Sequence, residues 1–187
     1  MELSGTLDPI HYGHMEMLDL ARKKLKINDA MVMPANRNPY KEPTPLDMRV
    51  DMARLAYAQD ENVKVLHRGN NEHKLPQNKE GIIPIRIVGA DLIMHTAKSD
   101  KMKEYFGSWL ENQTAVAGTR DHLVGFDDFM RQLEVLNKEF NIDWHVVKNS
   151  KDISSTIVRA NVGNDAAMKD LIPPAVHDYI KEHDLYK

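Results

Sequence analysis

Short apolar runs alternate with longer amphipathic stretches over most of the chain. The apolar runs have the length of single strands, and most of the stretches between them have the length of helices. The runs are Ala30–Met33, Val63–Leu66, Ile82–Val88, Thr114–Ala117 and Trp144–Val147. Because strands that alternate with helices pair in parallel, this pattern predicts an α/β fold with a doubly wound parallel sheet.

The amphipathic stretches predict where the helices lie. We place them at His14–Leu25, Pro45–Ala58, Ala90–Leu110, Asp127–Phe140 and Pro174–Glu182. Thr44 and Pro45 predict the start of one helix, because a hydroxyl side chain caps a helix and proline is tolerated in its first turn. Gly107 predicts a break within the long stretch that begins at Ala90.

The chain has the length and composition of one domain. Its 187 residues, 42% of them hydrophobic, can bury a single core. Neither an internal repeat nor a linker divides the sequence. We therefore expect a single domain over residues 1–187, with a helical C-terminal portion at about residues 154–187.

Composition also argues against several classes of function. Charged residues make up 28% of the chain and no apolar run approaches a membrane span, so we expect no membrane partner. The net charge is −3 and no long run of Lys or Arg occurs, which argues against nucleic acid as the main partner. The absence of cysteine excludes disulfides and thiolate metal sites. Met1–Ser4 lack the features of a signal peptide, and we expect a cytoplasmic protein.

The segment Ser4–His14 directly precedes a predicted helix. Its glycines and turn residues let backbone amides approach a ligand closely, and the following helix directs its positive end toward that ligand. His11 and His14, with Gly13 between them, can reach the same ligand. These features favour a triphosphate over a zinc ion, because zinc needs a third and usually a fourth ligand and the chain has no cysteine to supply one.

A second segment, Asp152–Arg159, follows the last predicted strand. Ser154, Ser155 and Thr156 combine a helix cap with free backbone amides, and Arg159 adds a guanidinium group that matches phosphate oxygens. In a parallel sheet, both segments would lie at the carboxyl ends of strands, where ligands bind. The pattern predicts a phosphate chain held between them.

Together the two segments resemble the His-x-Gly-His and Ile-Ser-Ser-Thr-x-x-Arg motifs of the nucleotidyltransferase α/β-phosphodiesterase superfamily. Within it, the chain is similar to the bacterial nicotinate mononucleotide adenylyltransferase family. Further similar segments follow in the same order as in that family: Asn38–Lys41, Arg49–Ala56, Val88–Asp91 and a C-terminal stretch from Ile172 to Tyr186.

The resemblance implies a Rossmann-like sheet and an enzyme of NAD biosynthesis. Such an enzyme moves AMP from ATP to nicotinate or nicotinamide mononucleotide and releases pyrophosphate. Its partners would be ATP and the mononucleotide, with Mg²⁺ bound through the ATP phosphates; homo-oligomerisation stays open.

The resemblance also implies roles for individual residues. His11 and His14 would be catalytic, at the ATP phosphates. The expected ATP-binding residues are Gly5, Thr6, Gly13, Ser154, Ser155, Thr156 and Arg159. The expected acceptor-binding residues are Lys41, Asp91, Trp109 and Arg120. For Asp91 the competing role is a helix cap, and for Trp109 it is packing.

Two departures from the family bear on these expectations. Only Met1–Leu3 precede Ser4, so we expect the first strand to be short or to begin upstream. The family's Thr-rich segment at the pyridine ring has no counterpart between Leu66 and Ile87. Alternatives therefore stay open: another acceptor such as phosphopantetheine, a cytidylyltransferase that uses CTP, or a nucleotide-binding module without catalysis.

Overall fold

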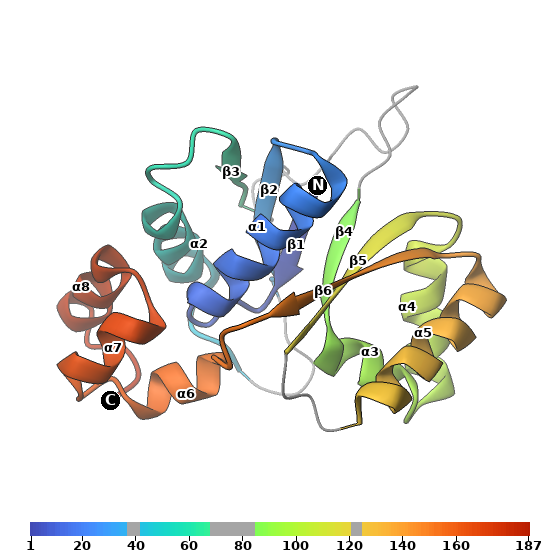
Figure 1. Cartoon of the computed structure of the whole chain (residues 1–187). Coiled ribbons are helices and arrows are strands. Elements are labelled where there is room, and N and C mark those ends of the chain that lie inside the picture. The colour runs from blue at the N-terminus through green and yellow to red at the C-terminus, as the bar shows by residue number, and fades with distance from the viewer. Residues whose placement is uncertain (37–41, 68–84, 121–124) are drawn as a thin grey trace.

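A computed structural model describes residues 1–36, 42–67, 85–120 and 125–187, with only the backbone of Arg120 described (Figure 1). Its strands form one six-stranded sheet in the order β3-β2-β1-β4-β5-β6, and all pairs are parallel. The strands are β1 (Glu2–Gly5), β2 (Ala30–Pro34), β3 (Val63–Val65), β4 (Arg86–Gly89), β5 (Thr114–Arg120) and β6 (Asp143–Asn149). The predicted doubly wound, Rossmann-like α/β fold is confirmed.

The strand order reverses between β1 and β4, which are neighbours in the sheet. In doubly wound sheets, ligands bind at such a reversal, beyond the carboxyl ends of the strands. Strand β1 is short, as expected, and it pairs with both β2 and β4. Of the predicted run Ile82–Val88, residues 82–84 lie outside the described residues.

Helices cover both faces of the sheet (Figure 1). They are α1 (Tyr12–Leu25), α2 (Leu46–Ala56), α3 (Ala90–Thr96), α4 (Asp100–Leu110), α5 (Phe126–Phe140), α6 (Ser155–Ala160), α7 (Asp165–Leu171) and α8 (Pro174–Glu182). The short helices α6 and α7 were not predicted as separate elements. Within the described residues, no helix is long and apolar enough to cross a membrane.

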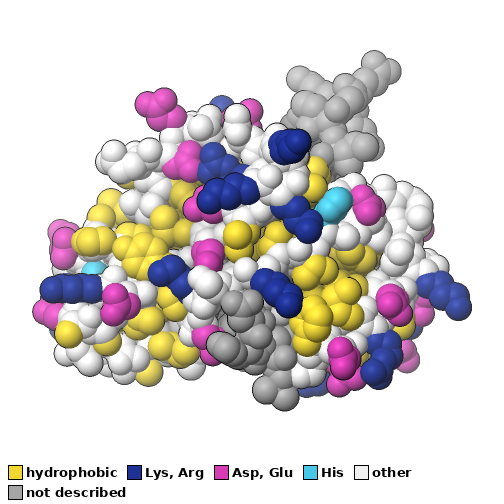
Figure 2. All heavy atoms as spheres, in the orientation of Figure 1, with side chains coloured by type: hydrophobic (Ala, Val, Ile, Leu, Met, Phe, Trp, Pro, Cys, Tyr) yellow, Lys and Arg dark blue, Asp and Glu magenta, His cyan; other side chains and the backbone are white. Residues whose placement is uncertain are grey.

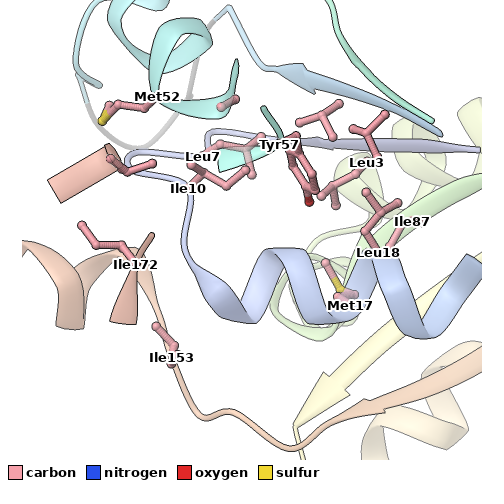
Figure 3. Close-up of a cluster of buried hydrophobic side chains, with 14 of the residues drawn as sticks. Leu3, Leu7, Ile10, Met17, Leu18, Met52, Tyr57, Ile87, Ile153 and Ile172 are labelled. Atoms are coloured by element: carbon pink, nitrogen blue, oxygen red, sulfur yellow. The ribbon is translucent and has the colours of Figure 1, made fainter. Parts of the chain in front are cut away.

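Two hydrophobic cores lie on opposite faces of the sheet. Alternate residues of the central strands divide between them: Ile87 and Val116 belong to one core, Val88 and Ala115 to the other. The first core joins the sheet to α1, α2 and the C-terminal helices, and part of it is drawn in Figure 3. The second joins the sheet to α3, α4 and α5. On the surface shown in Figure 2, basic and acidic side chains are interspersed.

Two local predictions were wrong. The long helix breaks between Thr96 and Asp100 rather than at Gly107, because the Ser99 side chain caps α4 by accepting a hydrogen bond from the Met102 amide. Gly107 lies inside α4, where a side chain would overlap the ring of Phe140 on α5. Glycine at this position therefore lets two helices approach each other.

The start of α2 also differs from the prediction. Pro45 occupies the cap position without a side-chain hydrogen bond, and the helix begins at Leu46. Thr44 instead donates its backbone amide to the Asp8 carboxylate, 3.2 Å away. This tertiary contact fixes the entry to α2 in place of the predicted hydroxyl cap.

Candidate active site

The two histidines of the first motif lie in residues 6–14, which run from the end of β1 into the first turn of α1 and are called the histidine loop. His11 has an extended backbone at the cap position of α1 and is 4% exposed. His14 lies in the first turn of that helix and is half-buried. Their rings stack, with centroids 3.7 Å apart and planes inclined by 27°. The loop therefore presents two imidazoles as one unit at the positive end of α1.

Gly13 allows the start of α1 to approach the segment that follows β6. A Cβ atom at this position would lie 3.1 Å from Nδ1 of His11 and 3.3 Å from the Ile153 carbonyl oxygen. The Asn149 side-chain amide, at the end of β6, donates to the Gly13 carbonyl at 2.8 Å. The two sequence motifs therefore meet, as predicted, and glycine provides the space between them.

The second motif forms the start of α6. The Ser154 hydroxyl accepts a hydrogen bond from the Ile157 amide at 3.2 Å, so this serine caps the helix. Upstream, the Glu16 carboxylate on α1 accepts bonds from the Ser150 amide and hydroxyl and from the Lys151 amide, at 2.5–3.2 Å. Burial opposes ionisation of Glu16, but these hydrogen bonds outweigh it and lower the pKa of the carboxyl group.

Two side chains of the second motif donate to the backbone of the first. The Ser155 hydroxyl donates to the Pro9 carbonyl at 2.9 Å. Nη1 of Arg159 donates to the Asp8 carbonyl at 2.6 Å, and Nη2 donates to the Thr156 hydroxyl at 3.3 Å. Ser155 and Arg159 thus hold the histidine loop itself, a role that the sequence did not predict.

Arg49 on α2 organises the ends of the two neighbouring strands. It is 1% exposed, and its Nε donates to the Thr44 carbonyl at 2.7 Å. Its Nη1 donates to the carbonyls of Thr6 at 2.6 Å and Ala35 at 2.8 Å. From the sequence, Arg49 was identified only as part of a family segment, and this role was not predicted. An arginine among the apolar positions of an amphipathic helix was the available signal.

Asp8 is a second residue whose role was not predicted from the sequence. It is 5% exposed, and its carboxylate accepts hydrogen bonds from the Thr44 amide at 3.2 Å and the Tyr186 hydroxyl at 2.7 Å. A buried carboxylate needs such donors, because desolvation without them is costly. Asp8 therefore joins the histidine loop to α2 and to the C-terminus.

The predicted acceptor residues have different outcomes. Asp91 is exposed in the first turn of α3, directly after β4, and therefore lies at the carboxyl edge of the sheet. At neighbouring Gly89, an added Cβ would meet no atom within 4 Å. Lys41 lies outside the described residues, and so does the side chain of Arg120.

Trp109 lies apart from the other candidates. It belongs to the last turn of α4, and its ring centre is 4.6 Å from the guanidinium carbon of Arg86, the first residue of β4. The helix returns antiparallel to the strands, so its end lies at their amino ends, away from His11. This placement favours packing, the competing role that the sequence left open for Trp109.

Residues 3–161 match the family described as cytidylyltransferase-like. The chain belongs to this family. Its resemblance to the nucleotidyltransferases is thereby confirmed over most of the sequence.

Curated relatives of this cytidylyltransferase-like chain match almost its full length. A protein of Clostridium botulinum (strain Alaska E43 / Type E3), named "Probable nicotinate-nucleotide adenylyltransferase", is 26% identical over 206 residues, covering 99% of this chain and 96% of the relative. A protein of the same name from Dehalococcoides mccartyi (strain CBDB1) is 28% identical over 211 residues, covering 98% and 95%.

A solved structure supports the fold of the cytidylyltransferase-like chain. Plasmodium falciparum nicotinic acid mononucleotide adenylyltransferase, complexed with NaAD, superposes with a TM-score of 0.73. The two are 17% identical, and the match covers 99% of this chain and 95% of the other. This likeness concerns the arrangement of strands and helices.

Proposed function

We propose that this chain transfers the adenylyl group of ATP to nicotinate mononucleotide, with release of pyrophosphate, as a cytoplasmic step of NAD biosynthesis. The observation that carries the proposal is the junction of the two motifs. The Asp8 and Pro9 carbonyls accept hydrogen bonds from Arg159 and Ser155, beside the stacked histidines. The names of relatives that match nearly the whole chain support nicotinate mononucleotide as the acceptor.

In the proposed reaction, a phosphate oxygen of the mononucleotide attacks the α-phosphorus of ATP. The bond from that phosphorus to the oxygen bridging to the β-phosphate breaks, and pyrophosphate leaves with the bond's electron pair. Such chemistry depends on positioning and on stabilising charge at the phosphate oxygens. We assign His11 and His14 to this task, with His14 as the donor to the reacting phosphate.

We assign the remaining ATP contacts to the segments that follow β1 and β6. Gly5, Thr6 and Gly13 would offer backbone or hydroxyl donors to ATP, and Ser154–Thr156 would offer the amides at the start of α6. Arg159 carries five N–H donors, so it can hold the Asp8 carbonyl and still bind a phosphate oxygen.

For the acceptor, we keep Lys41, Asp91 and Arg120 as candidates. Mg²⁺ would enter with ATP, because this ion commonly binds through substrate phosphates and water. Among the residues that the structure describes, no group of three His or carboxylate side chains gathers as a resident metal site would require.

An acceptor panel tests the proposed function. The protein is mixed with Mg²⁺, ATP or CTP, and either nicotinate mononucleotide, nicotinamide mononucleotide or phosphopantetheine, and pyrophosphate is measured. We expect the greatest release with ATP and nicotinate mononucleotide. Release with phosphopantetheine alone, or with CTP alone, would contradict the assignment. Calorimetric binding of ATP without turnover on any acceptor would instead favour a nucleotide-binding module.

A further inference from the structure

The C-terminus of the chain reaches the loop that carries the two histidines. The hydroxyl of Tyr186, the penultimate residue, donates to Oδ1 of Asp8 at 2.7 Å. The two residues are 178 positions apart, so this contact joins the ends of the chain. In Figure 1 the C-terminus lies beside α6 and α7, below α8.

Asp8 receives this bond at a junction of several segments. Its other carboxylate oxygen accepts the Thr44 amide before α2, and its backbone carbonyl accepts Nη1 of Arg159 on α6. The next carbonyl, that of Pro9, accepts the Ser155 hydroxyl. Side chains of the second motif therefore fix the position of Asp8. Because His11 follows Asp8 by only three residues, the same bonds bear on the position of His11.

The backbone beside Asp8 needs such support. Leu7 has a left-handed conformation, with a φ of 48°, and is 2% exposed. This conformation is unfavourable for a residue with a branched side chain and persists where surrounding contacts enforce it. The hydrogen bonds at Asp8 can hold Leu7 in this conformation. One of them comes from Tyr186, near the C-terminus.

We propose that Tyr186 is a positioning residue for the reaction: its hydroxyl, through Asp8, holds the loop of His11 and His14 in register with Arg159. The effect on turnover rests on the proposed adenylyl transfer. Burial raises the pKa of the Tyr186 hydroxyl, and the hydrogen bond to the Asp8 carboxylate acts in the same direction. The hydroxyl therefore keeps the proton that it donates throughout the neutral pH range.

Tyr179 provides a matched control. It lies on α8, and its hydroxyl contacts the Asp51 carboxylate of α2 at 3.5 Å. Tyr179→Phe thus removes a phenol–carboxylate contact between a C-terminal tyrosine and α2. It leaves the histidine loop untouched.

The test compares Tyr186→Phe with Tyr179→Phe by steady-state kinetics and by NMR of the histidine side chains. Tyr186→Phe keeps the ring and should fold. We expect its kcat to fall about tenfold while KM for ATP and for the mononucleotide changes less than about twofold, because misplaced histidines weaken the transition state more than the ground state. The imidazole signals of His11 and His14 should shift in Tyr186→Phe and stay in place in Tyr179→Phe.

Equal effects of the two variants on kcat, or unmoved His11 and His14 signals in Tyr186→Phe, would overturn the inference. The NMR comparison needs no turnover. If the wild-type protein transfers no adenylyl group, the proposed function fails, and the imidazole signals alone then decide whether Tyr186 positions the loop.

Discussion

His14 is the side chain to which the proposed chemistry assigns the greatest effect on rate. Its ring stacks on buried His11, and Gly13 between them leaves room for the carbonyl of Ile153. The site therefore holds the ring in place before a substrate arrives. Preorganised donors contribute most when the charge that they stabilise develops in the transition state.

Replacing His14 with alanine should lower kcat by on the order of 10²-fold, the usual effect of removing such a donor. His145→Ala is the control, because His145 lies in β6 and its Nε2 is 3.3 Å from Asp143 at the start of that strand. Steady-state kinetics with ATP and nicotinate mononucleotide measures both. A loss below about threefold in folded His14→Ala, or an equal loss in the two variants, would remove His14 from the reacting centre.

Arg49 holds the backbone around the site in place and has no assigned part in the reaction. Its planar guanidinium group donates to carbonyls that follow β1, follow β2 and precede α2. Burial lowers its pKa, but arginine stays charged in proteins. A lysine has one ammonium group on a flexible stem and cannot reproduce this planar arrangement.

Arg49→Lys should therefore reduce the free energy of unfolding by about 1–3 kcal/mol, the cost of leaving a buried carbonyl without its donor. Urea unfolding measures the loss. Arg54→Lys on the same helix is the control: its pair with Asp51 is exposed, and we expect a change within about 0.5 kcal/mol. Similar values for the two variants would show that the three carbonyl contacts of Arg49 contribute little.

At the scale of elements, α1 and the segment after β6 are joined by the Glu16 carboxylate. The bonds to Ser150 and Lys151 lower the pKa of Glu16 despite its partial burial. A carboxyl group with a lowered pKa stabilises the fold above its unfolded-state pKa, near 4.3 for glutamate. That stabilisation is lost as the pH falls through the pKa of Glu16 in the folded state.

Glu16→Gln should therefore lower the free energy of unfolding at pH 7 by on the order of 1 kcal/mol. The difference in this free energy between variant and wild type should shrink below about pH 4. Urea unfolding at a series of pH values measures it. Glu104→Gln, at an exposed position of α4, serves as the comparison and should show little change at any pH. A Glu16→Gln difference that is constant with pH would mean that the charge of Glu16 is not what holds the segment.

At the scale of the whole molecule, the sequence predicted what depends on local pattern. Strand-length runs and helical periodicity identified the parallel sheet, and Pro174–Glu182 was predicted with its observed bounds. The motifs at His11–His14 and Ser154–Arg159 were also found, because their residue types are chemically distinctive. Their meeting at the carboxyl ends of β1 and β6 followed from the topology of a parallel sheet.

Contacts between distant residues could not be predicted in this way. The bonds from Asn149 to Gly13 and from Tyr186 to Asp8 span 136 and 178 positions, and no periodicity encodes them. The position of Trp109 relative to the histidines could not be predicted for a related reason, since spacing along the chain does not say at which end of the sheet a helix finishes. The break at Ser99 required its hydrogen bond with Met102, which outweighed the glycine signal at residue 107.

The most direct test of the central claim follows labelled phosphorus through the reaction. Wild-type protein and His14→Ala are incubated with Mg²⁺, nicotinate mononucleotide and ATP labelled at either the α- or the γ-phosphorus. Adenylyl transfer predicts that the α label enters a dinucleotide and the γ label enters pyrophosphate, with both greatly slowed in the variant. Transfer of the γ label to the mononucleotide, or release of the α label as AMP without a dinucleotide, would contradict the account.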